Sequence, residues 1–333
     1  MSNKNVQVTL ANRPVGWVKE TDFRIAESEM PKPGAGEVLV RNIYLSLDPY
    51  MRGRMNDVKS YAASVQIGQV MVGGTAGEIV ESHNPNFKPG DSVVGQFGWQ
   101  QYGVSKGTTL RKVDPQLVPL SKYLGAVGMP GLTAWWGLLD IGQPKTGETV
   151  VVSAAAGAVG SVVGQIAKLK GCRAVGIAGG KTKCDIVVNE FGFDACVDYK
   201  AGNLFRDLRE AAPRGIDIYF ENVGGEVLDT VALQLNPFAR IPLCGLVSQY
   251  NEVRPRGMNN FVMLLINRVK VQGFIVSDYA DRSATAVAEL AGWVRAGTIT
   301  CRETIAEGIE NAPRAFIGML KGENIGKQLV KLF

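Results

Sequence analysis

The stretch from Val150 to Gly171 reads VVVSAAAGAVGSVVGQIAKLKG and predicts a strand, a tight turn and a helix in succession. Its β-branched run suits a buried strand, and the apolar residues after the turn recur at helical spacing. Ala155, Gly157 and Gly160 occupy the three positions of the G-x-G-x-x-G pattern, with alanine in the first. Gly157 lets the backbone approach a pyrophosphate, and Gly160 lets the helix pack on the strand with its N-terminus towards the anion. The pattern predicts dinucleotide binding; the alternative is a packed strand, turn and helix without a ligand.

The chain differs in character on the two sides of this stretch. Up to about Val113 it consists of short alternating segments broken by proline and glycine, such as PKPGAGEVLVRNIYLSLDP, which are typical of antiparallel β structure. Later, apolar strand patterns alternate with helical ones, as in TVVVSAA, RAVGIAG, DIYFENVG and ARIPLCGLVS. This alternation predicts right-handed crossovers and a doubly wound parallel sheet, hence an α/β fold. The final KQLVKLF is a candidate strand that returns to the first domain.

Composition disfavours several classes of function. The 333 residues are 46% hydrophobic and 20% charged, and a net charge of +5 scattered along the chain argues against nucleic-acid binding. We find no signal-peptide pattern and no apolar run of the ~20 residues that cross a bilayer, so we expect a cytoplasmic protein without membrane contact. His83 is the only histidine, which disfavours a histidine-based triad or metal site. The five cysteines form no C-x-x-C pair and predict buried thiols: Cys172, Cys184, Cys196, Cys244 and Cys301.

The end of the second predicted strand bears on which dinucleotide is bound. An NAD site usually has an acidic residue about 20 residues after the glycine-rich turn, where it binds the ribose hydroxyls. Here the sequence is AVGIAGGKTK, which lacks a carboxylate and offers Lys181 and Lys183. Two lysines without an acid favour the 2′-phosphate of NADPH, although each lysine could also be a solvated surface residue.

Several separate motifs resemble one known family. The segments LSLDPYMRGRM, GMPGLTAWWGLLDIG and ENVGGEVLD, together with the glycine-rich turn, resemble the zinc-independent medium-chain dehydrogenase/reductase superfamily. The chain is most similar to the branch that contains prostaglandin reductase, plant alkenal double-bond reductases and bacterial curcumin reductase. The resemblance implies a Rossmann doubly wound parallel sheet, residues 125–299, inserted into a GroES-like antiparallel β domain, residues 1–124 and 300–333.

The resemblance also implies a set of cofactor contacts. Lys183 and Tyr199 would bind near the 2′-phosphate, and the family usually has a serine where Gly180 stands, so one hydroxyl contact is missing. Asn222 would face the cofactor ribose. The pyrophosphate would lie over Ala158, Val159, Gly160 and Ser161, and the nicotinamide-side contacts would be Cys244, Gly245, Leu246, Val247, Ser248, Tyr250, Phe274, Ile275, Val276 and Asn324.

The motifs that hold zinc in related dehydrogenases lack their ligands here, so we expect no metal. Hydride transfer to an α,β-unsaturated carbonyl needs only a positioned acceptor and donors for the enolate oxygen. Tyr50 and Tyr250 are the candidate catalytic donors; otherwise Tyr50 is a core aromatic and Tyr250 a loop residue that closes over the cofactor. Arg52 either orients its loop or binds an acidic substrate tail.

These observations favour an NADPH-dependent reductase of 2-alkenals and enones, with a small unsaturated carbonyl compound as substrate. A quinone reductase with the same fold and cofactor is the nearest alternative, and a non-catalytic NADPH-binding sensor or partner-binding protein is a further one. The resemblance implies a homodimer joined through edge strands of the Rossmann sheet. Its seam would be the apolar run FVMLLINRVKVQGFIV, which could instead be buried core.

Overall fold

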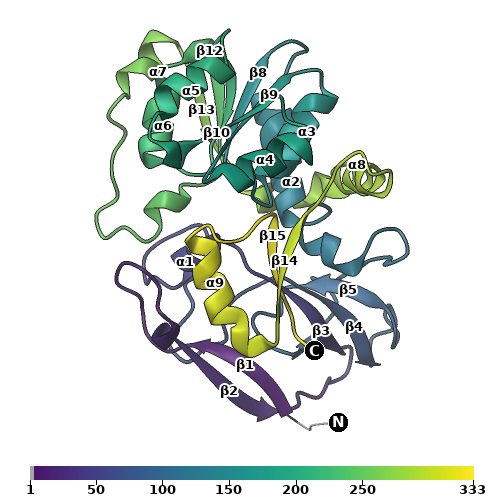
Figure 1. The fold of residues 1–333 in the computed structure, drawn as a ribbon. Coiled ribbons are helices and arrows are strands. Elements are labelled where there is room, and N and C mark those ends of the chain that lie inside the picture. The colour runs from purple at the N-terminus through teal and green to yellow at the C-terminus, as the bar shows by residue number, and fades with distance from the viewer. Residues whose placement is uncertain (1–3) are drawn as a thin grey trace. The chain divides into compact units, whose positions relative to one another are not determined.

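The computed structural model describes residues 4–333, which form two compact units (Figure 1). Unit 1 runs through Leu124 and resumes at Glu303–Phe333, whereas unit 2 is Gly125–Arg302. The chain therefore leaves unit 1 once, builds unit 2, and returns.

Unit 2 is built on a six-stranded sheet in the order β10-β9-β8-β11-β12-β13. Every neighbouring pair in it is parallel. The TVVVS strand is buried along its whole length, as expected for a parallel strand covered on both faces. The doubly wound parallel sheet predicted from the sequence is thus confirmed. The strands are β8 (Thr149–Ser153), β9 (Arg173–Ala178), β10 (Ala195–Asp198), β11 (Ile216–Phe220), β12 (Leu235–Leu243) and β13 (Lys270–Gly273).

Helices cover both faces of this sheet and enclose a hydrophobic core on each. Val150 and Val152 belong to one core, and Val151 between them belongs to the other, because successive side chains of a strand point to opposite faces. The helices of unit 2 are α2 (Met129–Trp136), α3 (Gly160–Leu169), α4 (Lys181–Asn189), α5 (Leu204–Ala211), α6 (Gly225–Ala232), α7 (Val262–Ile266) and α8 (Ser283–Arg295).

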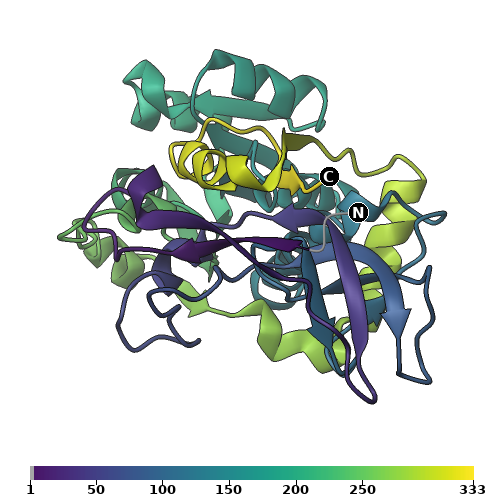
Figure 2. The same cartoon turned by 90° about the horizontal axis from the view of Figure 1, so that it is seen from below.

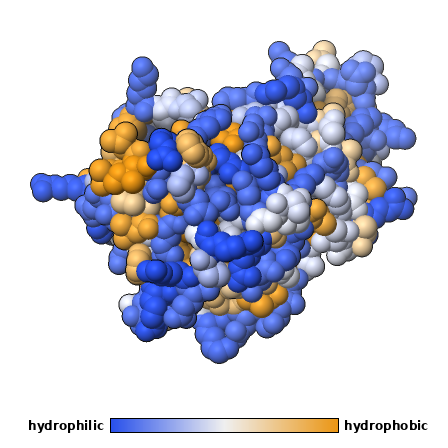
Figure 3. All heavy atoms as spheres, turned by 90° about the horizontal axis from the view of Figure 1, so that it is seen from above, coloured by the Kyte–Doolittle hydropathy of each residue, from blue (hydrophilic) through white to orange (hydrophobic). Residues whose placement is uncertain are grey.

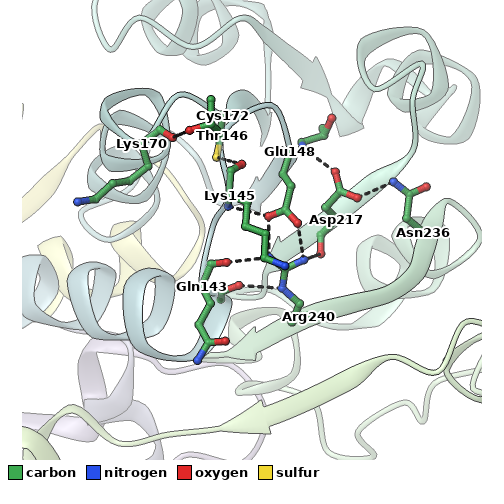
Figure 4. A network of polar contacts seen from close by, with 11 residues as sticks. Gln143, Lys145, Thr146, Glu148, Lys170, Cys172, Asp217, Asn236 and Arg240 are labelled. Carbon is green, nitrogen blue, oxygen red and sulfur yellow. Dashed lines mark hydrogen bonds and ion pairs between the residues drawn. The ribbon is translucent and has the colours of Figure 1, made fainter.

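The two ends of the parallel strands have different roles. The strand order reverses between β8 and β11, and in such sheets ligands bind outside the carboxyl ends at this reversal. The amino ends are tied by an ion pair in which Arg240 meets both oxygens of Glu148, at 2.9 and 2.6 Å (Figure 4). Arg240 also donates to the carbonyls of Gly142 and Gln143, both at 2.9 Å. The polar network at the amino ends holds the sheet together and leaves the carboxyl ends for a ligand.

Unit 1 contains a seven-stranded sheet in the order β14-β15-β3-β4-β5-β7, with β6 also on β3, and a separate β1-β2 pair. All its pairs are antiparallel except β14 with β15. The strands are β1 (Lys4–Leu10), β2 (Phe23–Glu29), β3 (Val38–Ser46), β4 (Thr75–Ser82), β5 (Ser92–Gly95), β6 (Tyr102–Ser105), β7 (Arg111–Lys112), β14 (Glu303–Glu307) and β15 (Lys327–Lys331), and the helices are α1 (Tyr50–Arg54) and α9 (Ala312–Leu320).

The last strand confirms the return predicted from KQLVKLF. Leu329 of β15 lies opposite Ser46 of β3, so the end of the chain completes a sheet begun near its start. In Figure 2 this C-terminal segment, drawn in yellow, lies among the purple and blue elements of the N-terminal part of the chain.

Candidate functional site

The turn between β8 and α3 has the geometry that its glycines predict. Ala154 has a φ of +51°, and the Gly157 N–H donates to its carbonyl at 2.9 Å, which closes the bend. A Cβ on Gly160 would lie 2.4 Å from the same carbonyl oxygen, so only glycine lets the helix start this close to the strand. No side-chain hydrogen bond caps α3, whose start follows the carboxyl end of β8, and an uncapped helix start at this place suits an anion site.

The loop after β10 brings Tyr199 and Lys200 against Gly179, and Lys183 at the start of α4, after β9, lies near Lys200. A Cβ on Gly179 would lie 3.0 Å from the Tyr199 hydroxyl and 3.0 Å from Cε of Lys200. Burial and the nearby Lys200 ammonium lower the pKa of Lys183. A dianion bound beside these two ammonium groups would offset the repulsion between them. The sequence analysis missed Lys200, although its place directly after Tyr199 in VDYK was the available signal.

Lys181, the other lysine of this loop, lies apart from this cluster. Its Nζ pairs with Asp185 at 2.6 Å, one helical turn away, and its side chain is 85% exposed. Lys181 is therefore already paired within its own helix, and the contact of Lys183 with the 2′-phosphate stays a prediction.

The conformation of Gly180 gives a physical reason for the glycine at this position. Its φ is +96°, a conformation that serine adopts only with strain, and its N–H donates to the Asp198 carboxylate at 2.7 Å. The same Asp198 oxygen accepts the Lys200 N–H at 2.9 Å. One carboxylate thus ties together the loops that carry Lys183 and Tyr199.

On the other side of the strand reversal, two turns pack on each other. Asn222 follows β11, and its side chain donates to the Ser153 carbonyl at the end of β8, at 2.8 Å. Its own carbonyl accepts the Val247 N–H at 3.0 Å. The Ser248 hydroxyl donates to the carbonyl of Val223 at 2.6 Å. The predicted ribose and nicotinamide contacts in residues 222 and 244–248 therefore belong to one hydrogen-bonded assembly.

Tyr250 bends back over the second of these turns. Its hydroxyl oxygen accepts the Leu246 N–H at 3.3 Å and lies 3.0 Å from the place of a Cβ on Gly245. Tyr250 thus packs on the turn that would line the nicotinamide half, and both its donor role and its covering role stay predictions.

The segment Phe274–Val276 follows the carboxyl end of β13, as the two turns described above follow β11 and β12. The Phe274 ring packs edge-on against Phe220, with centroids 6.3 Å apart, and fills the space beside Gly137. Its side chain therefore belongs to the core, which leaves its backbone for any ligand.

In unit 1, Tyr50 begins α1 and is half-buried. Burial and the neighbouring Asp48 carboxylate raise its pKa, so Tyr50 is a weaker acid than free tyrosine but keeps its hydrogen-bond donor. Arg52 is only 3% exposed and donates to the Gly16 carbonyl at 2.9 Å, to the Pro14 carbonyl at 3.3 Å and to Asn56 at 2.6 Å. These contacts support the loop-orienting alternative for Arg52 over contact with a substrate tail.

The segment with Asn324 is tied to the segment with Tyr50 by a buried ion pair that the sequence analysis missed. The Lys327 ammonium pairs with Asp48 and donates to the Leu47 carbonyl at 2.9 Å, and Lys327 is only 3% exposed. The Asn324 amide donates to the Gly326 carbonyl at 2.9 Å. No local pattern signals this pair, because its two members lie at opposite ends of the chain.

The polar groups of unit 2 fit a phosphorylated dinucleotide. An uncapped helix start with close glycines suits a pyrophosphate, and Lys183 with Lys200 suits a further phosphate. Across residues 4–333, no three His, Cys, Asp or Glu side chains group in a way that could hold a metal ion. In the same residues, no helix is both long and apolar enough to span a bilayer.

Comparisons with known proteins agree with this geometry. Residues 6–113 match a family model described as the N-terminal domain of oxidoreductase, and residues 158–292 match one described as zinc-binding dehydrogenase. The chain is 50% identical to the NADPH-dependent curcumin reductase of Escherichia coli, over 99% of this chain and 97% of that protein. It is 43% identical to the NADP(+)-dependent 2-alkenal reductase of Nicotiana tabacum, over 98% and 97%.

A solved structure is similar over nearly the whole length. CurA of Vibrio vulnificus, crystallised with NADPH, is 50% identical and superposes with a TM-score of 0.94, covering 98% of this chain and 99% of that one. The fold and site define an oxidoreductase with a Rossmann unit. More narrowly, the chain belongs to the zinc-independent branch of the medium-chain dehydrogenase/reductase superfamily, with the curcumin and 2-alkenal reductases, which confirms the resemblance.

Proposed function

We propose that this protein, an NADPH-dependent oxidoreductase, reduces the carbon–carbon double bond of α,β-unsaturated aldehydes and ketones. The proposal rests on the pair of lysines Lys183 and Lys200, which lie at the same carboxyl end of the sheet as the uncapped start of α3. This arrangement supports a cofactor with a pyrophosphate and a separate phosphate. Relatives 50% and 43% identical in sequence are named as an NADPH-dependent curcumin reductase and an NADP(+)-dependent 2-alkenal reductase.

The residues of unit 2 would share the cofactor as follows. The turn at residues 158–161 holds the pyrophosphate, Lys183 and Tyr199 hold the 2′-phosphate, and Asn222 meets the ribose. The turn at residues 244–248 and the backbone of Phe274–Val276 would line the nicotinamide half. In this arrangement Ser153 holds the turn at Asn222, and that turn holds the one at residues 244–248, so the nicotinamide half keeps one orientation.

When bound, NADPH supplies a hydride for the β-carbon of the acceptor. Negative charge then develops on the carbonyl oxygen, and a tyrosine hydroxyl stabilises it by donating a hydrogen bond. Tyr250 and Tyr50 are the candidates, and a tyrosine serves this role while protonated, so the raised pKa of Tyr50 does not oppose it. A proton from solvent or one of these hydroxyls completes the reduction at the α-carbon. Arg52 and Asn324 act by holding the loops that carry or neighbour Tyr50.

A substrate panel with product analysis tests this proposal. Purified protein is incubated with NADPH and, in turn, a 2-alkenal, an enone, a curcuminoid and a benzoquinone, and the products are identified by mass spectrometry. We expect saturated carbonyl products and a kcat/KM for the best alkenal or enone above that for the quinone. Faster quinone reduction would favour a quinone reductase. Tight NADPH binding without turnover on any acceptor would favour a sensor.

We further propose that two copies associate through the edge of the unit 2 sheet. Among the described strands, β13 pairs only with β12, so its other edge is open. Large apolar side chains beside it are exposed, including Leu265 at 77% and Phe261 at 68%. Figure 3 shows hydrophobic side chains gathered at the left of the face seen from above, the side of unit 2 labelled α7 in Figure 1. An open edge with an apolar border is typical of a strand that continues a sheet in a second copy.

A further inference from the structure

Glu221 is a buried carboxyl group at the strand reversal that the proposed function does not use. It follows β11, has no exposed surface, and forms a single bridge to Leu243 at the end of β12. Its backbone carbonyl accepts the N–H groups of Cys244 and Gly245, at 2.9 and 3.1 Å. It therefore lies beneath both turns of the nicotinamide half.

One oxygen of the carboxyl group organises the first turn. Oε1 accepts the N–H groups of Val223, at 2.5 Å, and Gly224, at 3.0 Å, and the Ser153 hydroxyl at 3.0 Å. Ser153 in turn accepts the Asn222 N–H at 2.9 Å. Three donors on one oxygen stabilise a carboxylate more than a neutral acid.

The other oxygen faces a different environment. Within residues 4–333, buried Oε2 forms no hydrogen bond of ordinary geometry, and the buried Tyr219 hydroxyl on the same face of the strand is a polar group that acts on this carboxyl group. Of the titratable side chains, Tyr219 acts on Glu221 and Glu221 in turn acts on Cys244, and within residues 4–333 Glu221 forms no ion pair with a lysine or arginine. Burial raises the pKa of Glu221 overall, although its hydrogen bonds lower it in part. Burial and the Glu221 charge raise the pKa of Cys244 to about 12, so this thiol stays neutral.

We propose that Glu221 is a positioning residue whose unneutralised carboxylate also tunes the bound cofactor in favour of its oxidised form. This inference rests on the proposed nicotinamide half of the site. The nicotinamide ring is neutral in NADPH and carries a positive charge in NADP⁺. A buried anion without a cation partner, under the turns that would hold this ring, attracts the oxidised form more than the reduced form. Bound NADPH is then a stronger hydride donor than it would be without Glu221.

The variant Glu221→Gln tests the charge while keeping the shape. Glutamine retains an acceptor for the Val223, Gly224 and Ser153 donors, and its amide can donate towards Tyr219. The dissociation constants for NADP⁺ and NADPH are measured by fluorescence titration without substrate. We expect the affinity of NADP⁺ relative to NADPH to fall by roughly fourfold or more, the effect of a unit charge over ~10 Å at an effective dielectric constant of ~40. Glu148→Gln, at the amino end of the same sheet, is the matched control and should leave this ratio unchanged.

The wild-type protein provides a second readout that does not depend on any variant. Burial raises the pKa of Glu221, and protonation removes its charge, so the relative affinity for NADP⁺ should fall as the pH is lowered, and Glu221→Gln should show a flat profile. The 2′-phosphate titrates in both cofactor forms, so its contribution cancels in the ratio.

Two results would overturn the inference. If Glu221→Gln weakened the binding of NADP⁺ and NADPH equally, Glu221 would only support the turns. If the ratio of the two affinities of the wild-type protein did not change with pH, the charge of Glu221 would not tune the cofactor. Failure of the proposed enone reduction is a separate outcome, because these titrations contain no acceptor. Wild-type protein that binds neither cofactor form would overturn both.

Discussion

Replacing Lys183 by alanine should lower affinity for NADPH while sparing NADH. The side chain is half-buried beside Lys200, and burial together with that neighbour depresses its pKa. A dianionic phosphate would relieve this repulsion and gain a charge-assisted hydrogen bond of about 1.5–3 kcal/mol. Because the site is partly exposed, solvent screening favours the lower half of this range, so we expect Lys183→Ala to weaken NADPH binding roughly ten- to fiftyfold. The loss should appear in the KM and the dissociation constant for NADPH, with those for NADH nearly unchanged.

A matched control lies two residues away. Lys181 is paired with Asp185 and exposed, so Lys181→Ala should change neither cofactor's affinity by more than about twofold. Adenosine 2′,5′-bisphosphate, which carries the 2′-phosphate without a nicotinamide, should lose affinity for Lys183→Ala as NADPH does. Equal losses with NADPH and NADH would refute the reasoning, because Lys183 would then support the loop and contact no phosphate.

Three further predictions concern other parts of the molecule. If the Tyr250 hydroxyl stabilises the enolate, Tyr250→Phe should lower kcat by more than it weakens NADPH binding. Tyr50→Phe should show the same pattern if Tyr50 faces the substrate. A loss of NADPH affinity as large as the loss of kcat would indicate that the tyrosine only covers the cofactor. Arg240→Met should cost about 2–3 kcal/mol of unfolding free energy in urea at pH 7, since it strands a mostly buried carboxylate. Although burial alone would raise the pKa of Glu148, its hydrogen bonds with Arg240 lower it overall, so this cost should shrink as the pH falls below about 4.5. The wild-type protein should be a dimer by light scattering at micromolar concentration and Val271→Asp, on the open edge of β13, a monomer; an unchanged mass would reject this seam.

The sequence predicted those parts of the fold that depend on local patterns. The β-branched run, the glycines and the helical spacing of residues 150–171 are contiguous, and β8, the turn and α3 follow them closely. The return of KQLVKLF to the first domain was also predicted, from its pattern and from the resemblance, whereas its pairing with β3 was not.

The contacts that hold the candidate site together depend on register and chain return, which no local pattern encodes. Glu221 meets Ser153 only because β11 lies beside β8 in one register, and Lys327 meets Asp48 only because the chain returns to unit 1. From the sequence alone, Glu221 looks like an ordinary charged residue in a glycine-rich turn. Its complete burial, which gives it its chemical interest, appears only once the strands are paired.

Isotope transfer from labelled NADPH tests the central claim most directly. The protein is incubated with NADPH deuterated at the transferring C4 position and a 2-alkenal, in the presence of a metal chelator, and the product is examined by NMR. The proposed reaction predicts full activity and a saturated aldehyde with deuterium on the β-carbon. Deuterium on the carbonyl carbon of an allylic alcohol, or activity lost to the chelator, would contradict it.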